Sequence, residues 1–143
     1  MNECKKYAPA VLRLVLGVTF ILAGVSKLGN PAGFVQVIKS MAPYLPELLG
    51  TAYGYALPYL EVVLGALLLL GLWTRVAAWV GAALVASFIL GVALATPDVP
   101  FLFDPAARAI PNKDFGFLAI AISLGLTGAG ALSLDARGKK CCK

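Results

Sequence analysis

The sequence predicts an all-α membrane protein: a four-transmembrane-helix bundle with a short amphipathic interfacial helix between spans 1 and 2. Of its 143 residues, 60% are hydrophobic and 13% are charged, and the mean hydropathy is +0.87. A soluble domain of this size carries more polar surface. The 12 lysine and arginine residues lie mainly at the ends of apolar runs, which is typical of membrane proteins. We therefore expect the lipid bilayer, and no nucleic acid, as a partner.

Four apolar runs are long enough to cross a bilayer, which takes roughly 20 residues of helix. None of them alternates polar and apolar residues, as the strands of a membrane β-barrel do. We expect a single domain over residues 1–143 that ends in a basic C-terminal tail at 135–143. The expected spans are about residues 8–28, 54–73, 76–95 and 115–134.

The connection after the first run predicts the short interfacial helix. Asn30 is a favourable N-cap, and Pro31 suits the first helical position. Apolar residues then recur at helical spacing as far as Met41, with polar residues between them. This pattern is typical of an amphipathic helix that lies in the membrane interface.

The distribution of basic residues predicts the orientation. If both termini are cytoplasmic, the inner face carries eight lysines and arginines and the outer face carries four, as the positive-inside rule requires. We expect a multi-pass protein of a prokaryotic plasma membrane. We do not expect the first run to be a cleaved signal, because Arg13 interrupts it and no A-x-A site follows.

Small residues line one face of the expected spans. Gly17 and Gly24 share a face with Arg13 in the first span, and Gly65 lies on a similar face of the second. Small residues allow transmembrane helices to approach closely, so packing alone accounts for this pattern. We expect structural roles for these residues and for Arg75, between the second and third spans.

Glu61 places an ionisable carboxyl group inside the second span. A charged group at the bilayer centre costs about 2.5–3.5 kcal/mol on insertion scales, so Glu61 should face the bundle. Counted from residue 54, it lies roughly 10 Å inside the outer end of its span. Lys27, near the outer end of the first span, is the expected partner. A structural ion pair and a proton-handling role are both open.

A polar pocket rimmed by tyrosines is expected near Lys27 and Glu61. It would open toward the outer side of the membrane. Its candidate residues come from the first two spans and from the connections before the second and the fourth: Phe20, Tyr53, Tyr55, Tyr59, Asn112, Lys113 and Asp114.

The composition disfavours metal and haem chemistry. The chain has no histidine, which removes the commonest metal ligand and the usual haem ligand. Its three cysteines are Cys4, Cys141 and Cys142, and no C-x-x-C motif is present. We expect no metal and no dithiol relay. Metal binding or lipid attachment at the tail cysteines stays open, although a basic tail that binds anionic headgroups is favoured.

Three segments resemble the DoxX family of small four-helix membrane proteins: "RLVLGVTFILAGVSKL", "PYLEVVLGALLLLGLWTR" and "GAGALSLDAR". The last departs from the family pattern, since Ala129 and Ala131 replace the usual proline and arginine. The resemblance implies redox association, of the kind in which thiosulfate, sulfur or thiol oxidation is linked to quinone.

Three functions remain open on the sequence. The first is a quinone-linked redox subunit, in which the pocket holds the quinone and Glu61 and Lys27 handle protons. Electrons would come from a redox partner or directly from the substrate. The second is a non-catalytic membrane anchor or assembly partner of a larger redox complex. The expected protein partner is a membrane or soluble redox protein, or further copies of this chain in a homo-oligomer. The third is a small-solute or lipid transporter, for which four short spans offer little room.

Overall fold

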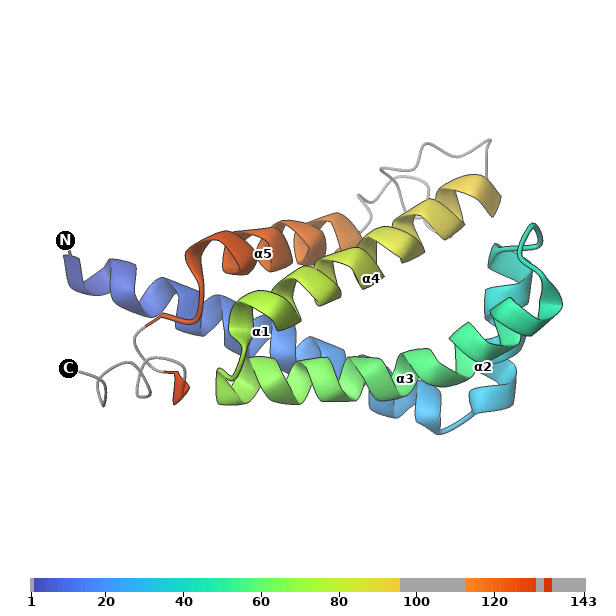
Figure 1. Cartoon of the computed structure of the whole chain (residues 1–143), viewed down its shortest axis with the longest axis horizontal. Helices are drawn as coiled ribbons and strands as arrows, with labels where there is room; N and C mark the ends of the chain where they lie inside the picture. The colour runs from blue at the N-terminus through green and yellow to red at the C-terminus, as the bar shows by residue number, and fades with distance from the viewer. Residues whose placement is uncertain (1, 96–112, 131–132, 135–143) are drawn as a thin grey trace.

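The computed structural model describes residues 2–95, 113–130 and 133–134, and these residues form an all-α architecture (Figure 1). Nothing further is described for the tail cysteines Cys141 and Cys142 or for Asn112, which lie outside these ranges. The five helices in the described residues are α1 (Asn2–Leu28), α2 (Pro31–Met41), α3 (Glu47–Leu70), α4 (Thr74–Ala95) and α5 (Lys113–Thr127).

The long helices lie side by side and alternate in direction along the chain (Figure 1). Helix α1 packs mainly against α3, α4 packs mainly against α5, and the short helix α2 packs against α3. Helix α2 and the first turns of α3 lie at one end of the molecule, opposite the N-terminal end of α1.

Within the part of the chain that the structure describes, three helices are long and apolar enough to cross a membrane. These stretches are Tyr7–Leu28, Glu47–Leu70 and Thr74–Leu94, with mean hydropathies of 2.1, 1.6 and 2.2. Helix α1 also exposes a stripe of large apolar side chains at helical spacing, as a lipid-facing surface requires. This stripe consists of Val11, Leu14, Val18, Leu22 and Val25.

The last helix is shorter than the sequence suggests. Helix α5 has 15 residues and ends at Thr127, whereas the apolar run continues to residue 134. Gly128 ends it by adopting a positive φ of 82°, and its N–H donates to the carbonyl of Leu124 at 2.8 Å. A glycine in this conformation is a common end to a helix.

Helix α3 is shifted toward the N-terminus relative to the expected span at 54–73. It begins at Glu47, an acidic residue in the first turn, where the helix dipole favours negative charge. It ends at Leu70 because Gly71 adopts the left-handed conformation, with φ 67° and ψ 38°. The N–H of Gly71 and that of Leu72 bond back to carbonyls of the last turn.

The expected short helix over residues 31–41 is present as α2. The Asn30 side chain accepts a hydrogen bond from the N–H of Gly33 at 3.0 Å, and Pro31 occupies the first turn. The helix buries Val35 and Ile38. Val35 packs directly on the backbone of Gly54, where an added Cβ would meet the Val35 side chain at 2.9 Å.

Glycines bring the backbones of α1 and α3 together. A Cβ added to Gly65 would lie 2.7 Å from the carbonyl oxygen of Gly17, and one added to Gly24 would lie 2.7 Å from that of Pro58. The buried core then extends through α4 to α5 and includes several alanines of these two helices. Its members are Leu16, Phe20, Leu64, Leu68, Ala77, Ala78, Ala82, Val85, Ile89, Ala121 and Leu124.

Candidate functional site

Glu61 lies deeper along its helix than the sequence analysis expected. It follows Glu47, the first residue of α3, by 14 residues, which corresponds to about 21 Å along the helix axis. The sequence placed the start of this span at residue 54, whereas α3 begins seven residues earlier, at Glu47. Glu61 therefore lies near the middle of the 24-residue helix and, with 5% exposure, is buried.

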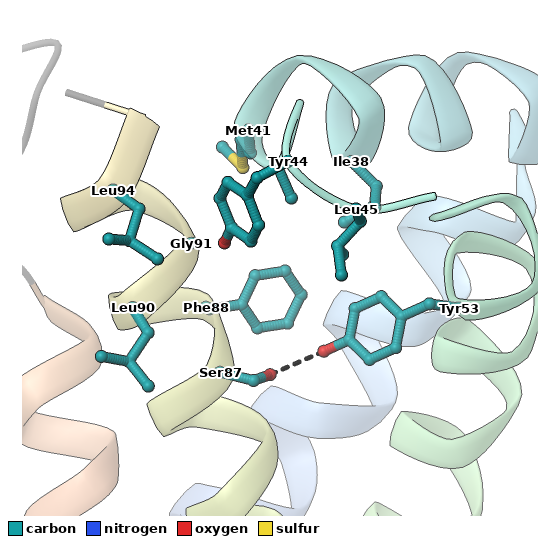
Figure 2. Close-up of a pocket in the computed structure, with 11 residues that line it drawn as sticks. Ile38, Met41, Tyr44, Leu45, Tyr53, Ser87, Phe88, Leu90, Gly91 and Leu94 are labelled. Carbon is teal, nitrogen blue, oxygen red and sulfur yellow. Dashed lines mark hydrogen bonds between the residues drawn. The ribbon is translucent and has the colours of Figure 1, made fainter. Parts of the chain in front are cut away.

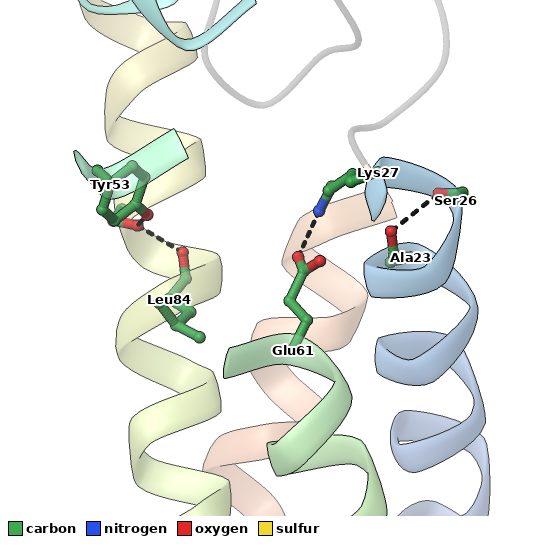
Figure 3. Close-up of polar contacts among 7 residues, drawn as sticks. Ala23, Ser26, Lys27, Tyr53, Glu61 and Leu84 are labelled. Carbon is green, nitrogen blue, oxygen red and sulfur yellow. Dashed lines mark hydrogen bonds and ion pairs between the residues drawn. The ribbon is translucent and has the colours of Figure 1, made fainter. Parts of the chain in front are cut away.

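The carboxylate of Glu61 forms an ion pair with Lys27 (Figure 3). Lys27 lies in the last turn of α1, and its side chain reaches toward α3. The side chains of Lys27 and Glu61 are 20% and 6% exposed, so both charges are largely removed from solvent. Glu61 Oε2 is buried and has no hydrogen-bond partner among the residues that the structure describes.

Two aromatic rings flank the Lys27 ammonium group. Its Nζ lies 5.1 Å from the centre of the Phe34 ring and 5.0 Å from that of Phe88. Both distances are within the range of a cation–π interaction. Phe34 belongs to α2 and Phe88 to α4, so Lys27 of α1 contacts Glu61 of α3 and one ring from each of α2 and α4.

A cavity of about 310 Å³ adjoins Phe88 and lies between α2, α3 and α4 (Figure 2). Phe88 both lines this cavity and contacts the Lys27 ammonium group. Most of the lining is apolar. We call this space the α2–α4 cavity; its lining residues are Ile38, Met41, Ala42, Tyr44, Leu45, Tyr53, Ser87, Phe88, Leu90, Gly91 and Leu94.

A pair of hydroxyl groups provides a polar point in the α2–α4 cavity. Tyr53 Oη and Ser87 Oγ are 2.6 Å apart (Figure 2). Ser87 Oγ also donates to the backbone carbonyl of Leu84 at 2.7 Å. The cavity thus has an apolar body and a localised hydrogen-bonding group, as small-molecule sites commonly do.

Most of the residues expected to line a pocket lie elsewhere. Tyr55 and Tyr59 are 47% and 63% exposed and do not line the α2–α4 cavity. They lie outside it because α3 turns Gly54, Pro58 and Glu61 toward the bundle. Phe20 also does not line it: its ring is buried in the core against Gly81 of α4.

The remaining candidates are Tyr53 of α3, Lys113 and Asp114 of α5, and Asn112. Tyr53 lines the α2–α4 cavity. Asp114 lies in the first turn of α5 and is partly buried, and it is absent from the cavity lining. Asn112 lies outside the described residues.

Sequence reasoning missed the roles of Phe34, Ser87 and Phe88. Phe34 lies on the apolar face of the amphipathic helix α2, and this pattern could have predicted that its ring faces the bundle. A serine within an apolar span carries a weaker signal, because its hydroxyl can bond to its own helix, as Ser87 does with Leu84.

Two arginines lie at the end of the bundle where α3 and α5 end. Arg13 is 3% exposed, and its Nη1 donates to the carbonyl of Ala129 at 3.0 Å. The guanidinium lies so close to Gly71 that a Cβ there would be 2.2 Å from Nη1. Arg75 is exposed, and its Nε would lie 3.2 Å from a Cβ on Gly128. Both therefore contact the glycines that follow α3 and α5.

These features define a multi-pass helical membrane protein in which a buried ion pair adjoins an apolar cavity. The chain belongs to the MauE family. The family model described as "Methylamine utilisation protein MauE" matches residues 5–98, which are 94 of its 143 residues. The matched region covers α2, α3 and α4 completely and begins within α1, so it includes the ion pair and the cavity.

A curated bacterial protein is similar over nearly the whole chain. It is named "Putative oxidoreductase CatD" and comes from Bacillus subtilis (strain 168). The identity is 28% over 145 residues, which cover 98% of this chain and 96% of the relative. No solved structure matches the chain significantly.

The expected membership of the DoxX family is wrong, because the matching family is MauE. The resemblance depended on glycines, on Lys27 and Glu61, and on arginines near the ends of spans. In the structure these residues pack helices together, pair charges and contact helix ends. Such requirements are common to small membrane bundles, so the residues that meet them do not distinguish one family from another.

Proposed function

We propose that this MauE-family protein is a redox-associated membrane subunit that binds a quinone in the α2–α4 cavity. One observation carries the proposal: Phe88 lines the cavity and also contacts the ammonium group of the Lys27–Glu61 ion pair. An apolar cavity suits the ring of a quinone, and the adjacent ionisable pair suits its proton chemistry. The relative named as an oxidoreductase supports the same class of function.

The dimensions and chemistry of the cavity fit this ligand. Its volume of about 310 Å³ lies at the lower end of the range for small-molecule sites, roughly 300–1,000 Å³. The Phe88 ring offers a face for stacking, and Tyr53 and Ser87 offer hydroxyl groups at one edge. A ring head would therefore find both apolar and polar contacts, with its tail toward lipid.

The proposed reaction is reduction of a quinone to a quinol. It requires two electrons, supplied by a partner redox protein, and two protons. Glu61 would relay one of these protons, since it is an ionisable group linked to the cavity through Lys27 and Phe88 and its Oε2 accepts no hydrogen bond from the described residues. The second proton would come from water. Lys27 would hold the carboxylate in place.

A fourth membrane crossing and an orientation belong to the same proposal. Helix α5 would be the fourth span of the bundle, and α2 would lie in the outer interface. Both termini would then be cytoplasmic in a prokaryotic plasma membrane, in accord with the excess of basic residues on that side.

Quinone binding to the purified protein in lipid nanodiscs tests the proposal. A short-chain ubiquinone should bind saturably to the wild type. Glu61→Gln should weaken this binding, because it leaves the Lys27 ammonium beside Phe88 without its counter-charge. Tyr59→Phe is the matched control, since Tyr59 is exposed on α3 outside the cavity. Unchanged binding in folded Glu61→Gln protein would contradict the proposal.

A membrane anchor for a larger redox complex is the second candidate. The close backbone contacts between α1 and α3 favour it, because an ion pair across such an interface also serves to fix helix register. Under this function, Glu61→Gln would lower stability while leaving quinone binding unmeasurable in both proteins.

A further inference from the structure

The hydrogen bonds at the polar edge of the α2–α4 cavity run in one direction. Ser87 has a single hydroxyl hydrogen, and the carbonyl of Leu84 can only accept. Ser87 therefore donates to Leu84 at 2.7 Å, and Tyr53 must donate to Ser87 across the 2.6 Å contact (Figures 2 and 3). Both hydroxyl hydrogens are used within the protein.

This direction determines what the cavity offers to a ligand. With its hydrogen committed to Ser87, Tyr53 Oη retains lone pairs that can accept a hydrogen bond. A ligand hydroxyl can donate to Tyr53 without breaking an existing bond. A ligand carbonyl would instead have to take the Tyr53 hydrogen away from Ser87, which costs one hydrogen bond for each one gained.

The other end of the cavity is bordered by exposed apolar side chains, as an opening toward lipid requires. Leu90 and Leu94 line it, are each 62% exposed, and lie on α4, one of the helices apolar enough to span a membrane. Gly91 lies between them in the sequence, and an added Cβ there would meet nothing within 4 Å. The cavity is therefore accessible to a molecule already dissolved in the bilayer.

We infer that the α2–α4 cavity selects a membrane-dissolved amphiphile whose head carries a hydroxyl donor, which Tyr53 accepts. The inference rests on the proposed function in one respect: for a quinone couple, it means that the reduced quinol binds more tightly than the quinone. Tighter binding of the reduced form favours reduction within the site. Tyr53 and Ser87 are thus specificity-determining residues.

A pair of redox-inert probes tests the inference separately from the proposed function. 4-Hexylphenol can donate a hydrogen bond, whereas 4-hexylanisole, its methyl ether, cannot. Binding to full-length protein in nanodiscs would be measured by calorimetric titration. Gly91→Leu protein, in which the leucine fills the cavity, gives the baseline for partition into lipid. Gly116→Leu is the matched control, because Gly116 also has open space around its Cβ but lies on α5.

The wild type should bind the phenol roughly threefold to tenfold more tightly than the ether, as one net hydrogen bond allows. Ser87→Ala should reduce this preference, because the Tyr53 hydroxyl hydrogen is then free to be donated to the ether oxygen. Tyr53→Phe should abolish the preference. Equal binding of both probes by the wild type, or a preference for the phenol that survives in Tyr53→Phe, would overturn the inference.

The outcomes separate the two proposals. If the probes bind equally but ubiquinone still binds in a Glu61-dependent way, the hydroxyl selection fails and the quinone function stands. If the phenol is preferred but ubiquinone does not bind, the selection stands and the quinone function fails. Probe signals that are identical in wild-type and Gly91→Leu protein would overturn the assignment of the cavity as the site.

Discussion

Lys27 and Glu61 form a buried ion pair that joins the last turn of α1 to the middle of α3. Breaking such a pair by removing one partner leaves the other charge buried and unpaired, which typically costs about 3–5 kcal/mol. Replacing both partners with apolar residues costs less, because no charge remains to be solvated. The pair is therefore testable as a unit.

A double-mutant cycle gives the first prediction. Lys27→Met and Glu61→Leu should each lower the free energy of unfolding by about 3–5 kcal/mol, and the double variant should be more stable than the sum of the two losses predicts. Unfolding in mixed micelles, followed by circular dichroism, measures these values. Losses that simply add would mean that the two groups do not interact energetically.

The second prediction concerns the contact between α1 and α3. Gly65→Ala should destabilise the protein by about 1–3 kcal/mol, because its new Cβ would lie 2.7 Å from the Gly17 carbonyl oxygen. Gly116→Ala is the matched control, with nothing within 4 Å of its Cβ. Thermal unfolding of both variants in the same detergent would compare them. Equal melting temperatures would show that the backbones are not in close contact.

The third prediction concerns the end of the bundle that holds Arg13. Arg13→Met should destabilise the protein by about 1.5–3 kcal/mol, since it removes a charged donor to the Ala129 carbonyl. Arg75→Met should have a smaller effect because Arg75 is exposed. Thermal unfolding again provides the comparison, and an equal loss in the two variants would refute a special role for Arg13.

The sequence predicted the all-α class and the short helix because these depend on local signals. Hydropathy over lipid-length runs identified the long helices, and the Asn30–Pro31 pair marked the start of α2. Helix ends were less accurate. The chain stays apolar beyond Gly128, so its composition predicts a longer last helix. Gly128 ends this helix by adopting a positive φ.

The location of the candidate site was predicted only in part, because it depends on which face of each helix turns inward. The sequence predicts a common position for Tyr53, Tyr55 and Tyr59, yet of these three only Tyr53 lines the cavity. Tyrosine occurs both at lipid interfaces and in polar pockets, so a tyrosine does not show whether its side of the helix faces lipid or the bundle. The earlier start of α3 at Glu47 also carries Glu61 further from the end of its helix.

Photoaffinity labelling with an azido-quinone tests the central claim, that a quinone occupies the α2–α4 cavity, most directly. After illumination in nanodiscs, mass spectrometry of proteolytic fragments would locate the adducts. The account predicts adducts on α4 between Ser87 and Leu94, competition by excess unlabelled quinone, and their loss in Gly91→Leu but not in Gly116→Leu protein. Competable adducts confined to the exposed face at Tyr55 and Tyr59, or labelling unaffected by Gly91→Leu, would contradict it.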